Sequence, residues 1–352
     1  MRALVYGAMA TVVVGLSLLA AGCGGNDSWS GGPVGWAVGK PDAGYGVILH
    51  TTDGGRTWVR QGSPAEIPNV EIDDVTAVDN LTAWAVGGAE NLGVILYTSD
   101  GGRTWNRQTV PPDAGKELSG IKAVSPSEAW ACGSGGVILH TTDAGRTWVK
   151  QNTPAIPPSN FQRLDAVGSG AVWVVGDKGG TDYPVVEYST DRGAHWTRQG
   201  GPGIFSDHLI DVSALSPISA WAVGGTPLNP PGQVVCRTLD GSTWTQVISL
   251  DPGDANGVCA VNSSTVWVVT DFDGIHKTTD GGATWTKQTV PRTGFYLLGV
   301  TATDERQAWV VGGGTENRGI ILHTTDGGAT WTEQAFPTEA WLRRVSFVGA
   351  RR

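Results

Sequence analysis

Between Asp74 and Gln108 the chain alternates short apolar runs with polar turns, a pattern that predicts four β-strands. The runs cover residues 74–78, 82–87, 93–98 and 105–108. Short strands with period-two alternation, separated by turns rich in Gly, Asp and Asn, are typical of antiparallel sheets. We therefore expect this segment to form one four-stranded sheet.

The same pattern of four runs is written seven times along the chain. Its clearest marker is Thr-Thr-Asp-Gly-Gly-Arg-Thr-Trp at residues 51–58. The acidic residues of the seven copies are Asp53, Asp100, Asp143, Asp191, Asp240, Asp280 and Asp326. They follow one another at a mean interval of about 45 residues, the length of one propeller blade. We predict an all-β fold, a seven-bladed β-propeller with four antiparallel strands per blade.

Tryptophan marks two positions in every copy of the repeat. The second-run tryptophans are Trp36, Trp84, Trp130, Trp173, Trp221, Trp267 and Trp309. Those after the acidic turn are Trp58, Trp105, Trp148, Trp196, Trp244, Trp285 and Trp331. A tryptophan buries roughly 150–250 Å², and a lone blade cannot cover both of its faces. We expect these side chains to pack between blades that stack around an axis.

The first and last repeats are incomplete, and together they make one blade. No strand signal precedes Trp36, whereas residues 342–348 form a strand signal with no blade after it. An unpaired strand leaves an open edge. We predict that the C-terminal strand completes the first blade, so that cutting the chain after Trp331 would open the ring.

The N-terminal segment carries targeting signals. Arg2 precedes an apolar stretch at residues 11–21 that is too short to span a bilayer, which indicates a signal peptide over residues 1–22. Cys23 follows small residues, as in the lipobox of bacterial lipoproteins, and plain secretion is the alternative. We expect residues 23–33 to be a lipidated Cys and flexible tether, and residues 34–352 to be the propeller. The protein would then lie in the cell envelope, lipid-anchored on the outer side of the cytoplasmic membrane.

The net charge and the cysteines limit which partners, disulfides and metal sites we expect. The whole chain has a formal net charge of −9, which argues against nucleic-acid binding because that requires a basic surface. Cys132, Cys236 and Cys259 stand where other repeats have apolar residues or Thr, so we expect buried thiols, with a Cys236–Cys259 disulfide as the alternative. No metal-ligand spacing of Cys and His occurs, and no cofactor is predicted. The sequence leaves open whether the acidic loop Asp271-Phe272-Asp273 binds a calcium ion.

The motif Ser/Thr-x-Asp-x-Gly-x-Thr-Trp resembles the Asp box, or bacterial neuraminidase repeat, a fold element that lies away from the active site in that family. Together with Trp-Ala-Val-Gly in the second run, it makes residues 36–348 resemble the photosystem II assembly and stability factor family. The resemblance implies a non-catalytic scaffold outside the cytoplasm that holds a segment of a membrane-protein complex, and we expect the protein to be a monomer. The repeat also occurs in bacteria without a photosystem, so neither the partner nor a photosynthetic role follows. The family is known for an arginine cluster. Arg56, Arg103 and Arg146 either form a basic arc or are solvated turn residues.

Strand alternation places a candidate binding site at one end of the ring. The long irregular connections share one face, where the innermost strands begin around the central channel. The residues just before the first apolar position of each innermost strand are Asp74, Gly120, Arg163, Asp211, Gly257, Gly299 and Arg344. One residue earlier come Asp73, Ser119, Gln162, Ile210, Asn256, Leu298 and Arg343.

We expect charged and aromatic residues at this mouth to bind a peptide or loop of a partner. The candidates are Asp73, Asp74, Arg163, Asp211, Arg343, Arg344, Phe161, His208, Tyr296 and Trp341, with Phe205 nearby. The alternative is that the charges pair with one another. If they bind a partner, replacing Arg163 and Arg344 together by Glu would abolish binding without changing thermal stability.

The main alternative function is a sialidase-like glycoside hydrolase or a glycan-binding propeller, because sialidases share the Asp box. Sialidase chemistry needs an arginine triad, a Tyr–Glu pair and an acidic residue. The Arg-Ile-Pro signature of that family is absent, and no Glu is obviously paired with Tyr183 or Tyr296. Two carboxylates, such as Asp73 or Asp74 with Asp211, would suit inverting hydrolysis instead.

Overall fold

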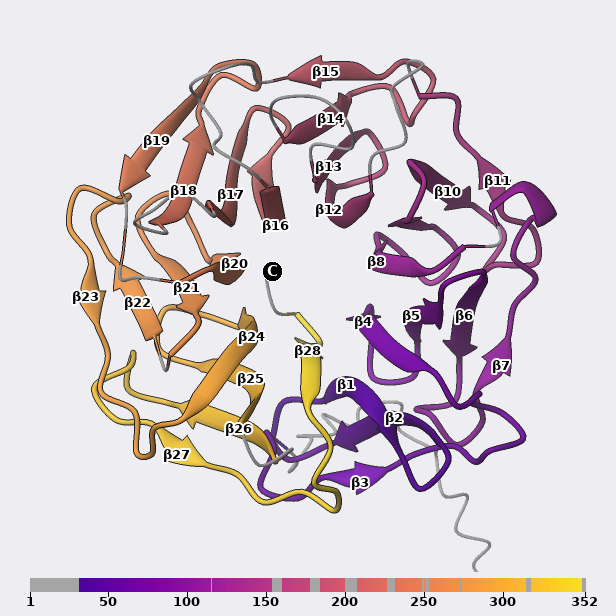
Figure 1. The fold of residues 1–352 in the computed structure, drawn as a ribbon, viewed down its shortest axis with the longest axis horizontal. Helices are drawn as coiled ribbons and strands as arrows, with labels where there is room; N and C mark the ends of the chain where they lie inside the picture. The colour runs from indigo at the N-terminus through magenta and orange to yellow at the C-terminus, as the bar shows by residue number, and fades with distance from the viewer. Residues whose placement is uncertain are drawn as a thin grey trace, which may run out of the picture. The chain divides into compact units, whose positions relative to one another are not determined.

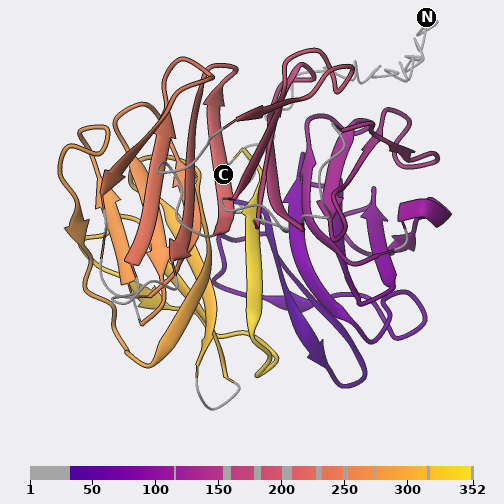
Figure 2. The same ribbon diagram turned by 45° about the horizontal axis from the view of Figure 1, so that its top comes forward.

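The computed structural model describes residues 32–114, 116–153, 160–177, 184–199, 208–226, 232–248, 250, 253–272, 274–314 and 318–349. Cys23, the signal and tether segments up to residue 31, Phe205 and Asp273 lie outside these residues. The described strands form seven four-stranded antiparallel sheets around a central axis (Figures 1 and 2). The prediction of a seven-bladed β-propeller is confirmed.

Each blade runs from an inner strand to an outer one. The inner strands are β28 (Leu342–Phe347), β4 (Glu71–Ala77), β8 (Leu118–Ala123), β12 (Phe161–Val167), β16 (His208–Ser216), β20 (Ala255–Ala260) and β24 (Phe295–Ala302). The second strands are β1 (Gly35–Asp42), β5 (Ala83–Ala89), β9 (Ala129–Gly133), β13 (Ala171–Gly176), β17 (Ser219–Thr226), β21 (Val266–Thr270) and β25 (Ala308–Gly314). We number the blades 1 to 7 in this order.

The third strands are β2 (Tyr45–Thr51), β6 (Leu92–Thr98), β10 (Val137–Thr141), β14 (Val185–Ser189), β18 (Gly232–Thr238), β22 (Gly274–Thr278) and β26 (Gly319–Thr324). The outer strands are β3 (Val59–Arg60), β7 (Asn106–Arg107), β11 (Val149–Lys150), β15 (Thr197–Gln199), β19 (Trp244–Ile248), β23 (Thr286–Lys287) and β27 (Thr332–Glu333). Most outer strands are shorter than the sequence pattern suggested. A 3₁₀ turn, η1 (Pro112–Ala114), follows β7, and no described helix is long and apolar enough to cross a membrane.

The C-terminal strand closes the ring as predicted. β28 pairs with β1 in the first blade, with Gly35 opposite Phe347 and Ala37 opposite Val345. Leu342, Val345 and Phe347 are buried against blade 7. The last strand therefore supplies both the missing edge of blade 1 and part of the core between the first and last blades.

Glutamine side chains link four of the described blades to the next blade through its tryptophan, from Gln61, Gln108, Gln199 and Gln334. Gln61 accepts hydrogen bonds from the indole nitrogens of Trp36, 3.1 Å away in its own blade, and Trp105, 3.2 Å away in the next. Its amide nitrogen donates to the backbone oxygen of Gly101. Gln334 of blade 7 accepts a hydrogen bond from the indole nitrogen of Trp58 and donates one to the backbone oxygen of Gly54, both in blade 1. Hydrogen bonds of this type therefore also join the first and last blades.

The acidic turns join the third and outer strands, as the sequence predicted. In the first turn Oδ1 of Asp53 accepts from the backbone nitrogen of Thr57 at 2.9 Å, and Oδ2 accepts from its hydroxyl at 2.7 Å. Gly54 and Gly55 have φ values of +76° and +87°, which glycine adopts without strain. These turns are structural elements, and they lie at the end of the ring opposite the beginnings of the inner strands.

Candidate functional site

A polar cavity of about 500 Å³ lies at the end of the ring where the inner strands begin. Its lining residues are Asp73, Glu117, Ser119, Ser134, Asn160, Gln162, Arg163, His208, Ile210, Asn256, Leu298, Arg343 and Arg344. They include one residue at the same position of every inner strand, so all seven blades contribute. The irregular connections at residues 178–183, 200–207 and 227–231 lie outside the described residues.

β-Bulges direct these seven side chains into the cavity. In β4, Ile72 pairs with Gly87 and Asp74 with Val86, which leaves Asp73 as the extra residue. The same irregularity singles out Ser119, Gln162, Ile210, Asn256, Leu298 and Arg343 in the other inner strands. A bulge inserts one unpaired residue and re-aims its side chain, and bulges are common beside functional sites.

A glycine in the second strands is a sequence signal for these bulges that we did not recognise from the sequence alone. The glycine that ends Trp-Ala-Val-Gly lies against the bulge: a Cβ on Gly87 would overlap the backbone oxygen of Glu71, and one on Gly133 that of Glu117. Gly39, Gly176, Gly224 and Gly312 are similarly placed. In these six blades glycine accommodates the close approach of the bulged strand, whereas blade 6 has Thr270 at the same position.

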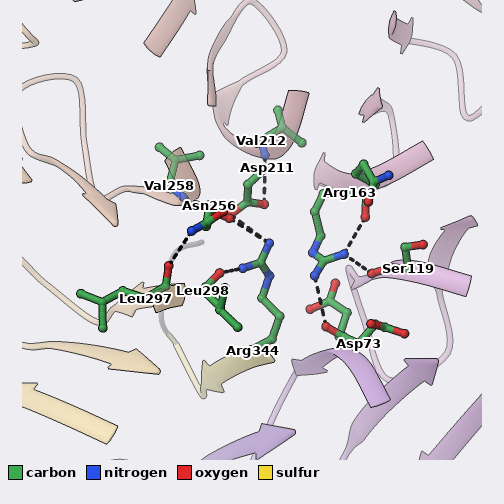
Figure 3. Close-up of polar contacts among 12 residues, drawn as sticks. Asp73, Ser119, Arg163, Asp211, Val212, Asn256, Val258, Leu297, Leu298 and Arg344 are labelled. Carbon is green, nitrogen blue, oxygen red and sulfur yellow. Dashed lines mark hydrogen bonds and ion pairs between the residues drawn. The ribbon is translucent and has the colours of Figure 1, made fainter. Parts of the chain in front are cut away.

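Arg163 and Arg344 cross the cavity from opposite sides (Figure 3). The Arg163 guanidinium donates to the backbone oxygens of Ser119, Gln162 (2.7 Å) and Asp73 (3.2 Å). Arg344 donates to the backbone oxygens of Leu298 and Asn256, the latter at 3.2 Å. Each therefore holds strands one and two blades back around the ring, and both are less than a tenth exposed.

These contacts correct one prediction. We expected that replacing Arg163 and Arg344 by Glu would leave thermal stability unchanged. The structure contradicts that, because both guanidiniums satisfy buried backbone carbonyls, and a carboxylate in their place would leave those carbonyls unpaired and repel them. The double replacement therefore cannot separate binding from folding.

Asp74 and Asp211 bridge neighbouring inner strands. Oδ1 of Asp74 accepts from the backbone nitrogen of Val75 and Oδ2 from that of Ile121 in the next blade, both at 2.9 Å. Asp211 does the same for Val212 and Val258, at 3.0 Å each (Figure 3). Neither carboxylate belongs to the cavity lining, and Asp74 is fully buried. Their expected place at the mouth was wrong, since both are turned toward the adjacent strand.

The aromatic candidates and His208 occupy different parts of the structure. Phe161 is 1% exposed and packs between blades 3 and 4, so its assignment to the mouth was wrong. His208 lines the cavity, and its Nε2 lies 3.5 Å from Oδ2 of Asp254. Tyr296 and Trp341 lie outside the lining and stack on each other with ring centroids 6.0 Å apart.

One side of the cavity concentrates carboxylates. Asp73 lies among Glu71, Glu117 and Arg343, and the Nε of Arg343 donates to Glu71. Burial raises the pKa of Asp73 to about 7, although Arg163 opposes the shift. Burial and the nearby Glu71 also raise the pKa of Glu117. This side of the cavity therefore offers carboxylate oxygens as hydrogen-bond acceptors, next to guanidiniums that already donate to other groups of the protein.

The remaining sequence candidates lie away from this cavity. Arg56, Arg103 and Arg146 are exposed on the acidic turns, at the opposite end of the ring. Cys132, Cys236 and Cys259 are buried thiols outside any disulfide, which excludes the Cys236–Cys259 bond in this structure. Asp271 accepts from the Asn256 amide, and among the described residues no group of three His, Cys, Asp or Glu side chains could hold a metal ion.

Residues 28–115 and 108–185 match the sequence model of the family described as photosynthesis system II assembly factor YCF48. The predicted resemblance to this family is confirmed. No curated protein matches the chain.

Solved structures extend the likeness to the whole ring. One described as YCF48 bound to D1 peptide has 19% identity and a TM-score of 0.58, covering 75% of this chain and 81% of that one. YCF48 from Cyanidioschyzon merolae has 17% identity and a TM-score of 0.60, covering 84% and 96%. A GH74 xyloglucanase from Xanthomonas campestris has 14% identity and a TM-score of 0.61, covering 91% and 55%. At these identities the structures show a shared fold.

Proposed function

We propose that this protein is a non-catalytic binding scaffold that holds a peptide segment of a membrane-protein complex in its central cavity. The observation that carries the proposal is the ring of bulged residues, because seven blades each turn one side chain into a single polar cavity. A rigid scaffold with its variable connections at one end is well suited to binding. The family match and the peptide-bound YCF48 structure support the same class of partner.

The described chain enters the ring at the end that carries the acidic turns. The backbone oxygen of Pro33 accepts from the nitrogen of Gly54, so the chain enters the ring beside an acidic turn, opposite the cavity. If Cys23 is lipidated, the nine residues from it to Gly32 could span at most about 30 Å. A tether of that length would keep the ring near the membrane, within reach of loops or tails that extend from the partner complex.

The hydrogen bonds of two carboxylates favour a scaffold over a hydrolase. Asp74 and Asp211, which suggested a pair for inverting hydrolysis, instead accept hydrogen bonds from backbone amides of adjacent strands. A sialoside and xyloglucan hydrolysis screen tests this point directly. Turnover that is lost in Asp73→Asn would overturn the non-catalytic part of the proposal.

Filling the cavity tests the binding function. Ile210 lines the cavity and is partly exposed, so Ile210→Trp should obstruct it and reduce recovery of one membrane complex from native membranes. Val149→Trp, at an exposed position of β11 on the outer rim, is the matched control and should bind normally. Equal recovery with both folded variants would place the binding surface elsewhere.

A further inference from the structure

The cavity contains an acceptor that the protein does not satisfy. Among the described lining side chains, the buried polar atoms without a hydrogen-bond partner are Oδ2 of Asp73 and Nε of Arg163. Arg163 already donates to three backbone carbonyls through its other nitrogens. The Asp73 carboxylate has no comparable compensation, and a buried acceptor without a donor is costly.

The carboxylate and guanidinium side chains that line the cavity come from blades 1 to 4. They are Asp73, Glu117, Arg163, Arg343 and Arg344. Arg343 pairs with Glu71, and Arg344 lies 3.8 Å from Asp211. His208 lies next to Asp254. The two carboxylates that line the cavity therefore lie on the side of blades 2 and 3, at Asp73 and Glu117.

The guanidiniums do not make this cavity an anion site. Arg163 and Arg344 direct their donors to backbone oxygens of the inner strands, and Arg343 directs its Nε to Glu71. An entering carboxylate would have to compete with those acceptors and would also meet Asp73 and Glu117. A cationic donor would give the Asp73 carboxylate a hydrogen-bond partner.

We propose that Asp73 receives a primary ammonium group, from a lysine side chain or a free N-terminus, of the segment bound in the cavity. This inference rests on the proposed function, since it names the chemistry of the group that the same cavity recognises. The ammonium donates to the Asp73 carboxylate, and Glu117, which also lines the cavity, adds attraction. Arg163 holds the Asp73 backbone from the other side and fixes the acceptor in place.

Binding of this kind is coupled to proton release. Asp73 faces Arg163 on β12, Arg343 on β28, Glu71 on β4 and Glu117 at the start of blade 3, and burial raises its pKa to about 7. The ionised form needed for the ammonium therefore falls roughly tenfold between pH 8 and pH 6. Affinity for an ammonium should fall by about the same factor.

The test uses the peptide acetyl-Gly-Lys-Gly-amide and NMR titration of the full propeller. The lysine peptide should shift backbone signals of residues 73–75 and 119–121, and its Nε-acetylated form should not. Asp73→Asn should weaken binding by at least about tenfold and remove the pH dependence, with the melting temperature unchanged or raised. Asp113→Asn, at an exposed acidic residue outside the cavity, should bind like the wild type.

Three results would overturn the inference: no shift with the lysine peptide, unchanged affinity in a folded Asp73→Asn variant, or stronger binding of acetyl-Gly-Glu-Gly-amide. The obstructing Ile210→Trp variant separates this inference from the proposed function. If that variant still loses the membrane complex while the lysine peptide fails to bind, the cavity binds a different chemical group. If neither effect is seen, the proposed function fails as well.

Discussion

Arg163 and Arg344 occupy the same position on the inner strands of blades 4 and 1, and each donates to backbone oxygens one and two blades back. Arg163 thereby connects blades 4, 3 and 2. Arg344 connects blades 1, 7 and 6, and its 3.8 Å approach to Asp211 adds blade 5. The two side chains together contact the inner strands of the whole ring, at the point where the cavity is formed.

Arg163→Leu should therefore destabilise the ring. The change removes a buried cation and leaves the carbonyls of Ser119, Gln162 and Asp73 without that donor. We expect a loss of about 3 kcal/mol in the free energy of unfolding, since an unpaired buried polar group costs roughly 1–3 kcal/mol. Chemical denaturation measures it, with the exposed Arg103→Leu as control. A loss as small as that of the control would show that Arg163 does not brace the ring.

Replacing the buried Glu187 should increase the stability of the protein. Its side chain is fully buried in β14, at the position of Leu49, Leu96, Leu139 and Leu322 in other blades, and both carboxylate oxygens lack a hydrogen-bond partner. Burial raises the pKa of Glu187 from 4.5 to about 7, with Arg198 opposing the shift. The folded state thus holds the proton more tightly than the unfolded chain, and ionisation costs stability as the pH rises from about 4.5 to about 7.

Glu187→Leu should raise the free energy of unfolding by about 3 kcal/mol more at pH 8 than at pH 4.5, because one pKa unit corresponds to about 1.4 kcal/mol. Arg198 lies 4.0 Å from Glu187, and its Nε and Nη2 are buried without a hydrogen-bond partner. Denaturation of wild type, Glu187→Leu and Glu187→Gln across this pH range measures the effect. The Gln variant should also lose the pH-dependent component, and an unchanged pH profile in both would refute the assignment.

The acidic turns predict the opposite pH dependence. Hydrogen bonds from the hydroxyl and backbone nitrogen of Thr147 lower the pKa of Asp143 to about 2. Its contribution to stability is therefore present above the unfolded pKa near 4 and is lost as the pH falls toward 2. Asp143→Ala should lower the melting temperature at pH 7 by more than at pH 2. Asp113→Ala serves as the exposed control, and a similar shift in both variants would count against a structural role for the turn.

The sequence predicted the repeating parts of this molecule well because each repeat encodes the same local chemistry. Trp36 and its six counterparts, the acidic turns and the incomplete terminal repeats were sufficient for the blade number, the strand order and the closure by β28. Local pattern also placed the mouth, since period-two alternation fixes where an inner strand begins.

The orientation of the mouth residues could not be predicted because it depends on bulges and on neighbouring blades. A bulge shifts the register by one residue, which exchanges the faces of adjacent side chains. For this reason Asp73 enters the cavity while Asp74 turns into the adjacent strand. Similarly, the residue type three positions before the acidic Asp varies from repeat to repeat, so the sequence does not show that His140 and Tyr188 each stack on the second-strand Trp of their blade.

The central claim is that the cavity end of the ring holds a segment of a membrane-protein complex. Photo-crosslinking from position 162 in native membranes tests it most directly, because Gln162 lines the cavity without supplying a side-chain brace. The same photoreactive residue at position 103, on the acidic-turn end, provides the control. We predict crosslinks to one integral membrane complex from position 162 and none from position 103. No crosslinks from position 162, or equal crosslinks from both positions, would contradict the account.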